Sequence, residues 1–145
     1  MTFSRHVVVN WQGGIMDGKG SAKAGTGAFD LPVTFPRRIG EPEGATSPEE
    51  LIAAAHATCY AMVVSANLGR RKASAAKTTV TCTVTADKGD AGIKITDSKL
   101  EVVAEGLQGI DAGAFEAMAR EAEGGCPVSG AIRNNVKIEV VVTVK

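Results

Sequence analysis

The sequence lacks a net charge and any excess of basic or acidic residues. Its 145 residues carry 16 Lys and Arg against 16 Asp and Glu, so the formal charge is zero. A chain without a basic excess has no broad positive face for nucleic acid or for anionic lipid, and small or uncharged partners are favoured. We therefore expect neither nucleic acid nor a membrane among its partners.

Long hydrophobic runs and abundant cysteine are also missing. The start, MTFSRHVVVNWQGG, has no apolar segment followed by a cleavage site, and no apolar run approaches the roughly 20 residues that span a bilayer. These absences predict a cytoplasmic, reducing location. A chain of this length buries about 70% of its extended surface on folding and needs no disulfide for stability. Its three cysteines therefore indicate thiol chemistry or core packing.

The residue pattern predicts one α+β domain over residues 1–145. The predicted elements are strands at 5–12, 15–24 and 29–35, a loop at 35–47, a helix at 48–68, strands at 78–88 and 92–106, helices at 110–122 and 127–134, and a last strand at 136–145. The strand-rich start reads as an antiparallel meander. We expect antiparallel sheets that cover the helix at 48–68.

This central helix has a strong start and a very apolar body. Ser47 can cap it, Pro48 suits its first position, and Glu50 completes a capping box. The following segment, LIAAAHATCYAMVVSANLG, is apolar on nearly every face and ends at Gly69. One small sheet does not cover so much apolar surface. We therefore expect two chains to share a core in a homodimer.

Cys126 lies in the segment EGGCPVSGAI, directly before Pro127. The proline predicts a short helix with the cysteine at its cap, so that the thiol faces free backbone N–H groups and the positive end of the helix dipole. Both favour the thiolate. The alternative is a small capping or buried residue. The two preceding glycines favour a reactive thiol.

The other two cysteines fall within predicted regular elements. A cysteine in the middle of an apolar helix, such as Cys59, is more often a small core residue than a nucleophile. Cys82 shares an alternating strand face with Val80 and Val84, so we assign it to the core. His56 lies three residues before Cys59 on the same helix face, which permits a Cys–His pair or two metal ligands. A histidine satisfied within the core is the simpler interpretation of His56.

Three charged residues near the start of the central helix are candidates for a site. Arg37 and Arg38 lie in the loop before it, and a fixed guanidinium lowers the pKa of a nearby thiol or binds a substrate oxygen. Glu49 suits the positive end of the helix dipole. Ten helical residues separate Glu49 from Cys59 by about 15 Å. The two residues can share a site only if an arginine bridges them or if Glu49 comes from a partner chain.

Two segments, TSPEELIAAAHATCYAM at 46–62 and EGGCPVSGAI at 123–132, resemble the OsmC/Ohr family of thiol-dependent organic hydroperoxide reductases. The resemblance spans nearly the whole chain. HATC and CPVSGAI are closer to the osmotically inducible (OsmC) branch than to the organic hydroperoxide resistance (Ohr) branch. The resemblance implies an intertwined homodimer with its active sites at the interface.

The same resemblance implies roles for individual residues. Cys59 would be the peroxidatic cysteine and Cys126 the resolving cysteine. Arg38 would activate the thiolate with Glu49 as its carboxylate partner, and Arg37 remains a rival to Arg38. The reaction would reduce an organic hydroperoxide to an alcohol, and an external dithiol, such as a lipoylated protein, would reopen the Cys59–Cys126 disulfide. No metal or other cofactor is required.

Two other interpretations stay open. The first is a binding module of the same fold, in which Cys59 and Cys126 merely line an apolar pocket for a lipid-like ligand. The second is a metal site built from His56 and these two cysteines. For the peroxidase, neighbours such as Tyr60, Met62 and Val63 would give Cys59 an apolar pocket that favours bulky organic peroxides over hydrogen peroxide.

Overall fold

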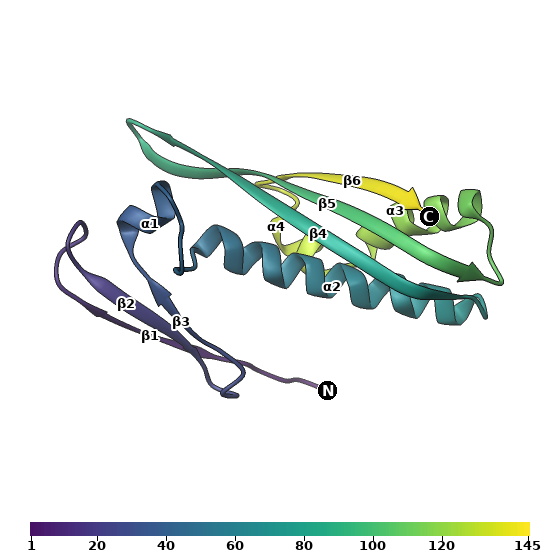
Figure 1. The fold of residues 1–145 in the computed structure, drawn as a ribbon, viewed down its shortest axis with the longest axis horizontal. Coiled ribbons are helices and arrows are strands. Elements are labelled where there is room, and N and C mark those ends of the chain that lie inside the picture. The colour runs from purple at the N-terminus through teal and green to yellow at the C-terminus, as the bar shows by residue number, and fades with distance from the viewer. The chain divides into compact units, whose positions relative to one another are not determined.

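The computed structural model describes residues 1–145 and consists of two compact units, Met1–Leu51 and Ile52–Lys145. The mixture of two sheets with helices confirms the α+β class. In chain order the elements of Figure 1 are β1 (Val7–Gln12), β2 (Lys19–Ala24), β3 (Asp30–Val33), α1 (Phe35–Ile39), α2 (Pro48–Arg70), β4 (Ser74–Gly89), β5 (Gly92–Gln108), α3 (Ala112–Gly124), α4 (Pro127–Ile132) and β6 (Lys137–Val144).

The N-terminal unit is the predicted antiparallel meander, followed by a short helix. β2 pairs with β1 on one side and with β3 on the other. Gly13 follows β1 with φ at +89°, a left-handed conformation that glycine adopts without strain. The segment predicted as a loop contains α1, because Thr34 caps it by accepting a hydrogen bond from the N–H of Arg37. Pro36 also lies in its first turn.

The C-terminal unit contains the second sheet, in the order β4-β5-β6. Figure 1 shows β4 and β5 as a long hairpin, with β6 beside β5. β6 runs parallel to β5, which differs from the antiparallel pairing expected from the sequence. The reason is the connection between them, because α3 and α4 carry the chain back along the sheet before β6 begins.

One face of α2 builds the core of this unit. Its buried residues His56, Tyr60, Val64 and Leu68 recur every four residues, which places them on one stripe of the helix. They pack against one face of β5 and against α3, whose buried members are Leu100, Val102, Ala104, Phe115, Met118, Ala119 and Ala122. This packing fixes the rotation of α2 about its own axis.

Side-chain caps mark the starts of two helices, α2 at the predicted residue and α3 two residues later than predicted. Ser47 Oγ accepts a hydrogen bond from the N–H of Glu50 at 3.1 Å and starts α2. The Glu50 carboxylate accepts from the Thr46 hydroxyl at 2.8 Å, in place of the reciprocal backbone bond of a complete capping box. Asp111 caps α3 by accepting from the N–H of Ala114 at 2.8 Å.

α2 also carries apolar surface that the single chain leaves uncovered. By length and composition it could cross a membrane, with a mean hydropathy of 1.5 in a window that is 22% buried. This corrects the expectation that no segment reaches that length, although the core helix of a globular protein passes the same test. Met62 on α2 is 67% exposed. The large apolar area of this helix is also the reason why the sequence predicts a second chain.

Candidate functional site

The structure brings Cys59 and Cys126 together, although 67 positions separate them in the sequence. Their Sγ atoms lie 3.0 Å apart. Cys59 comes from α2, beside the buried stripe, and Cys126 comes from the cap of α4. Cys126 is only 2% exposed, whereas Cys59 is half-buried. A reagent from solvent therefore meets Cys59 first.

Cys126 is the N-cap of α4, as the sequence predicts. Its sulfur accepts a hydrogen bond from the N–H of Ser129 at 3.5 Å, and Pro127 takes the first helical position. Burial disfavours the thiolate, but hydrogen bonding from Cys59 and from the N–H and hydroxyl of Ser129 outweighs it, so the pKa of Cys126 is lowered. The cap therefore prepares this sulfur to carry negative charge.

Cys59 has the opposite electrostatic environment. Burial raises its pKa, the neighbouring Cys126 raises it further, and the N–H of Val128 opposes both. Because the thiols lie so close together, the pair loses its protons in coupled steps, and the first negative charge rests mainly on Cys126. No cationic side chain contributes to the shift at Cys59. As a nucleophile, Cys59 needs a positive charge from another part of the protein.

A cavity of about 360 Å³ opens beside Cys59. Its wall consists of Cys59, Met62, Val63, Ala66, Asn67 and Arg70 from α2, with Gly125 and Pro127 from the other side. The apolar pocket expected around Cys59 is therefore present, and Met62 lines it as expected. Tyr60 does not, because its ring is fully buried and its hydroxyl donates to the carbonyl of Ala119 at 2.6 Å.

Arg38 and Glu49 form a tight ion pair in the N-terminal unit. Nε of Arg38 donates to both carboxylate oxygens at 3.1 Å, and Nη2 donates to Oε1 at 2.6 Å. The bond from Arg38 holds the pKa of Glu49 below its ordinary value, against a smaller opposing effect of burial. Arg37 is exposed and lies 3.5 Å from Glu43. Of the two rival arginines, Arg38 is the one that Glu49 holds.

His56 is fully buried, and both of its ring nitrogens are engaged. Nδ1 lies 2.7 Å from Ser98 Oγ, and Nε2 lies 2.7 Å from Ser129 Oγ. Burial lowers the pKa of His56, which favours the neutral ring. The ring is thus not free to bind a metal with Cys59 and Cys126, and the structure gathers no three His, Cys, Asp or Glu side chains suited to a metal.

Sequence reasoning missed the two serines that hold His56. Ser98 stands on the strand face that continues with Leu100 and Val102, and a hydroxyl in that position must find a buried partner. Ser129 stands three residues after Cys126. The N–H at this position donates to the side chain of a capping residue. The sequence contains both features, but neither identifies His56 as the residue that these serines contact.

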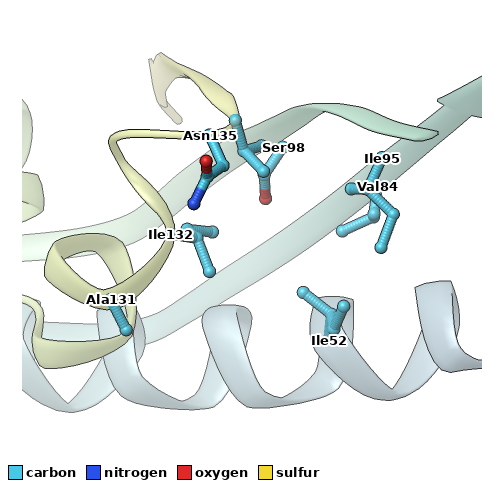
Figure 2. A pocket seen from close by; sticks show the side chains of 8 residues that line it. Ile52, Val84, Ile95, Ser98, Ala131, Ile132 and Asn135 are labelled. Carbon is cyan, nitrogen blue, oxygen red and sulfur yellow. The ribbon is translucent and has the colours of Figure 1, made fainter.

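A second cavity, of about 230 Å³, lies elsewhere in the C-terminal unit. Figure 2 shows Ile52 of α2 pointing toward Val84 and Ile95 of the hairpin. Ser98 and Asn135 are polar residues of the same cavity wall. No cysteine is among its lining residues. The binding-module interpretation requires a ligand in contact with the thiols. A ligand in this second cavity would not touch them.

The Arg38–Glu49 pair generates a prediction for stability against pH. The pKa of Glu49 is lower in the folded chain than its ordinary value of 4.5, so the stabilisation is present above that pH and is lost as pH falls through the folded value. We expect Glu49→Gln to lower the free energy of unfolding by about 1 kcal/mol at pH 7. Urea unfolding at pH 7 and pH 3.5 should show this difference shrinking at the lower pH.

The matched control is Glu43→Gln, because Glu43 pairs with Arg37 and is 81% exposed. Its effect should stay below about 0.5 kcal/mol at both pH values. Equal effects of the two substitutions on the free energy of unfolding at pH 7 would contradict the prediction that the Arg38–Glu49 pair stabilises the fold more than the exposed pair does.

Comparison with known proteins places this arrangement in a family. The sequence model of the OsmC-like protein family matches residues 40–141, which include both cysteine segments. The chain is 36% identical over 141 residues to peroxiredoxin OsmC of Escherichia coli strain K12, with 96% of each chain covered. It is 32% identical over 118 residues to the organic hydroperoxide resistance protein OhrA of Bacillus subtilis strain 168, covering 79% of this chain and 80% of that one.

Among solved structures, the chain is similar to an organic hydroperoxide resistance protein OsmC from Legionella pneumophila. The TM-score is 0.75 at 27% sequence identity, with 95% of this chain and 96% of that chain covered. The organic hydroperoxide resistance protein OhrB of Bacillus subtilis, at 22% identity and a TM-score of 0.73, has the same fold. The family match and the identity over nearly the full length agree: the chain belongs to the OsmC-like protein family.

Proposed function

We propose that this protein is a thiol peroxidase that reduces organic hydroperoxides through Cys59 and Cys126, with residues 1–145 acting as one domain in the cytoplasm. The observation that carries the proposal is the pair of sulfurs 3.0 Å apart, one beside a cavity and one buried at a helix cap. The names of the relatives, peroxiredoxin OsmC and organic hydroperoxide resistance protein, support a peroxidase-type role.

In the first step the Cys59 thiolate attacks the terminal oxygen of the hydroperoxide. The O–O bond breaks, Cys59 becomes a sulfenic acid, and the alkoxide takes up a proton and leaves as the alcohol. Cys59 is assigned to this step because it lines the cavity and is the more exposed of the two thiols. Cys126, at 2% exposure, is not accessible to a bulky substrate.

In the second step the Cys126 thiolate attacks the sulfenic sulfur of Cys59. The S–S bond forms as the S–O bond breaks, and the departing hydroxide takes up a proton and becomes water. The 3.0 Å separation of the two sulfurs means that little movement is needed. An external dithiol then reduces the disulfide by two exchange steps and is itself oxidised, and the family resemblance favours a lipoylated protein for this role.

Arg38 is proposed to supply the positive charge that Cys59 lacks. Burial raises the pKa of Cys59, so its ionisation requires a stabilising cation. The two-point ion pair with Glu49 keeps the guanidinium of Arg38 charged and restricts its orientation. The same guanidinium would stabilise the oxyanion that develops on the departing peroxide oxygen.

A homodimer is proposed as the functional unit. All six residues of β1 are exposed in the single chain, including the adjacent Val7, Val8 and Val9. Only four of the 23 residues of α2 are buried, although the helix is mostly apolar. Monomeric proteins rarely expose contiguous apolar surface on this scale, and a second copy of the chain would cover it.

The proposed chemistry predicts a specific disulfide. Reduced protein treated with one equivalent of cumene hydroperoxide should form a Cys59–Cys126 disulfide while Cys82 stays free, as mapped by thiol blocking and mass spectrometry. Cys59→Ser should abolish the reaction, and Cys126→Ser should leave a sulfenic acid on Cys59. Cys82→Ser is the matched control and should react as the native chain does. Three unmodified thiols in the native chain would instead support a binding module.

The cavity beside Cys59 predicts a preference among peroxides. Its wall is mostly carbon, so an apolar hydroperoxide gains binding energy there that hydrogen peroxide does not. We expect kcat/KM for cumene hydroperoxide to exceed that for hydrogen peroxide by about tenfold or more, since burying two or more CH₂ equivalents is worth at least about 1.4 kcal/mol. Equal values, measured with a saturating dithiol, would exclude the cavity as the determinant of substrate choice.

The uncovered face of α2 predicts the oligomeric state. Light scattering at micromolar concentration should give twice the chain mass of 14.9 kDa. Met62→Arg places a charge in apolar surroundings and should shift the mass toward the monomer, whereas Lys94→Ala at an exposed position of β5 should leave it unchanged. A native chain that runs as a monomer would contradict the proposed dimer.

A further inference from the structure

A continuous chain of buried hydrogen bonds links the third cysteine to Cys126. Cys82 Sγ on β4 lies 3.3 Å from Ser98 Oγ on β5, which lies 2.7 Å from Nδ1 of His56 on α2. Nε2 of His56 lies 2.7 Å from Ser129 Oγ on α4. Ser129 in turn donates its N–H to the Cys126 sulfur at 3.5 Å. His56, Ser98 and Ser129 are each no more than 1% exposed.

The two serines hold the ring of His56 from both of its nitrogens. Ser98 Oγ lies 2.7 Å from Nδ1, and Ser129 Oγ lies 2.7 Å from Nε2. Because both contacts are short and buried, they fix the ring relative to β5 and to α4.

Ser129 connects this ring to the resolving cysteine through two different groups. Its hydroxyl is engaged by His56, and its backbone N–H is donated to the Cys126 sulfur at 3.5 Å. The position of His56 therefore bears on the position of the N–H that Cys126 receives.

We propose that His56, oriented by Ser98, is a positioning residue for the resolving cysteine: it holds Ser129 through the hydroxyl and so fixes the N–H that Ser129 donates to the Cys126 sulfur, which stabilises the thiolate that attacks the sulfenic acid. The role of Cys126 in this statement rests on the proposed function. The link between His56 and Cys126 rests on the hydrogen bonds alone.

A purely structural role would give this arrangement one reason, the specification of a single core packing. Apolar side chains of similar volume fill a core at least as well as a buried polar network, which contributes little net stability even when every group is satisfied. Every member of this chain has a partner. The network ends on the one sulfur whose charge the second step requires.

Other ionisable groups lie around this chain of hydrogen bonds, and their effects on Cys126 have to be distinguished from the effect of His56. Cys59 and Tyr60 face Cys126 from α2, Cys82 faces His56 from β4, and Glu123 on α3 acts on His56 and Tyr60. Burial raises the pKa of Tyr60 to about 12, so it stays neutral over the working range. Glu123 is paired with Arg133 at 2.6 Å. None of these is altered by a substitution at His56.

The first test measures Cys126 without any peroxide. In a Cys59→Ser background, the titration of Cys126 is followed against pH by NMR through the chemical shift of its Cβ, which needs no reagent to reach the buried sulfur. We expect His56→Leu and Ser129→Ala to raise the midpoint by about one pH unit, the effect of one lost hydrogen bond to a charged group. His56→Gln keeps an amide group toward Ser129 and should restore most of the shift. Ser98→Ala, which frees Nδ1 of His56, should give a smaller rise.

The second test separates the two chemical steps in a single turnover of the otherwise native chain. Formation of the Cys59 sulfenic acid should be unchanged in His56→Leu, while disulfide formation at pH 7 should slow by about threefold. The thiolate fraction falls tenfold for one pH unit, but the nucleophilicity of the less acidic thiol partly compensates. His56→Gln should again restore the rate.

The control for general damage to the core is Tyr60→Phe. It also removes a buried hydrogen bond from α2, one turn away, but has no contact with Ser129. If His56→Leu does not fold, as judged by thermal unfolding, the Ser98→Ala and His56→Gln variants still decide the matter. A titration midpoint of Cys126 in the His56 variants equal to that of Tyr60→Phe would overturn the inference. A native chain that forms no sulfenic acid would instead refute the proposed function, with the titration result unaffected.

Discussion

The burial of one stripe of α2 is the constraint on which the rest of the C-terminal unit depends. His56, Tyr60, Val64 and Leu68 enter the core together, so the helix has a single rotation that satisfies all four. Cys59 is then carried to the edge of the stripe, where it is half-buried and borders a cavity. The packing of this stripe thereby positions Cys59 beside the cavity.

The same stripe connects the two thiols to one another. α3 packs on α2 through Tyr60, whose hydroxyl bonds to Ala119, and the chain leaves α3 directly into the cap of α4. The position of Cys126 is thus determined by packing that begins on the helix carrying Cys59. A sulfur separation of 3.0 Å between residues so distant in sequence follows from this shared core, without a bond between the sulfurs.

Local chemistry was readable in the sequence, whereas long-range proximity was not. Caps at Ser47 and Cys126 depend on neighbours within four residues, and both occur where predicted. The parallel pairing of β6 with β5 depends on how α3 and α4 return the chain, and no periodicity within β6 encodes it. Likewise, the sequence showed that His56 needed buried partners, but only the fold identifies Ser98 and Ser129.

The division of properties between the two sulfurs bears on how the proposed peroxidase would persist in its reduced form. A cysteine is vulnerable to oxidation when it is both ionised and accessible. Cys126 has a lowered pKa but is 2% exposed, and Cys59 is accessible but has a raised pKa. Neither sulfur alone combines the two conditions. In the proposed mechanism, limited access would protect the Cys126 thiolate from over-oxidation, and Cys59 would stay a thiol until a cation promotes its ionisation. The sulfur that would then meet a Cys59 sulfenic acid is the better ionised of the pair and lies 3.0 Å away.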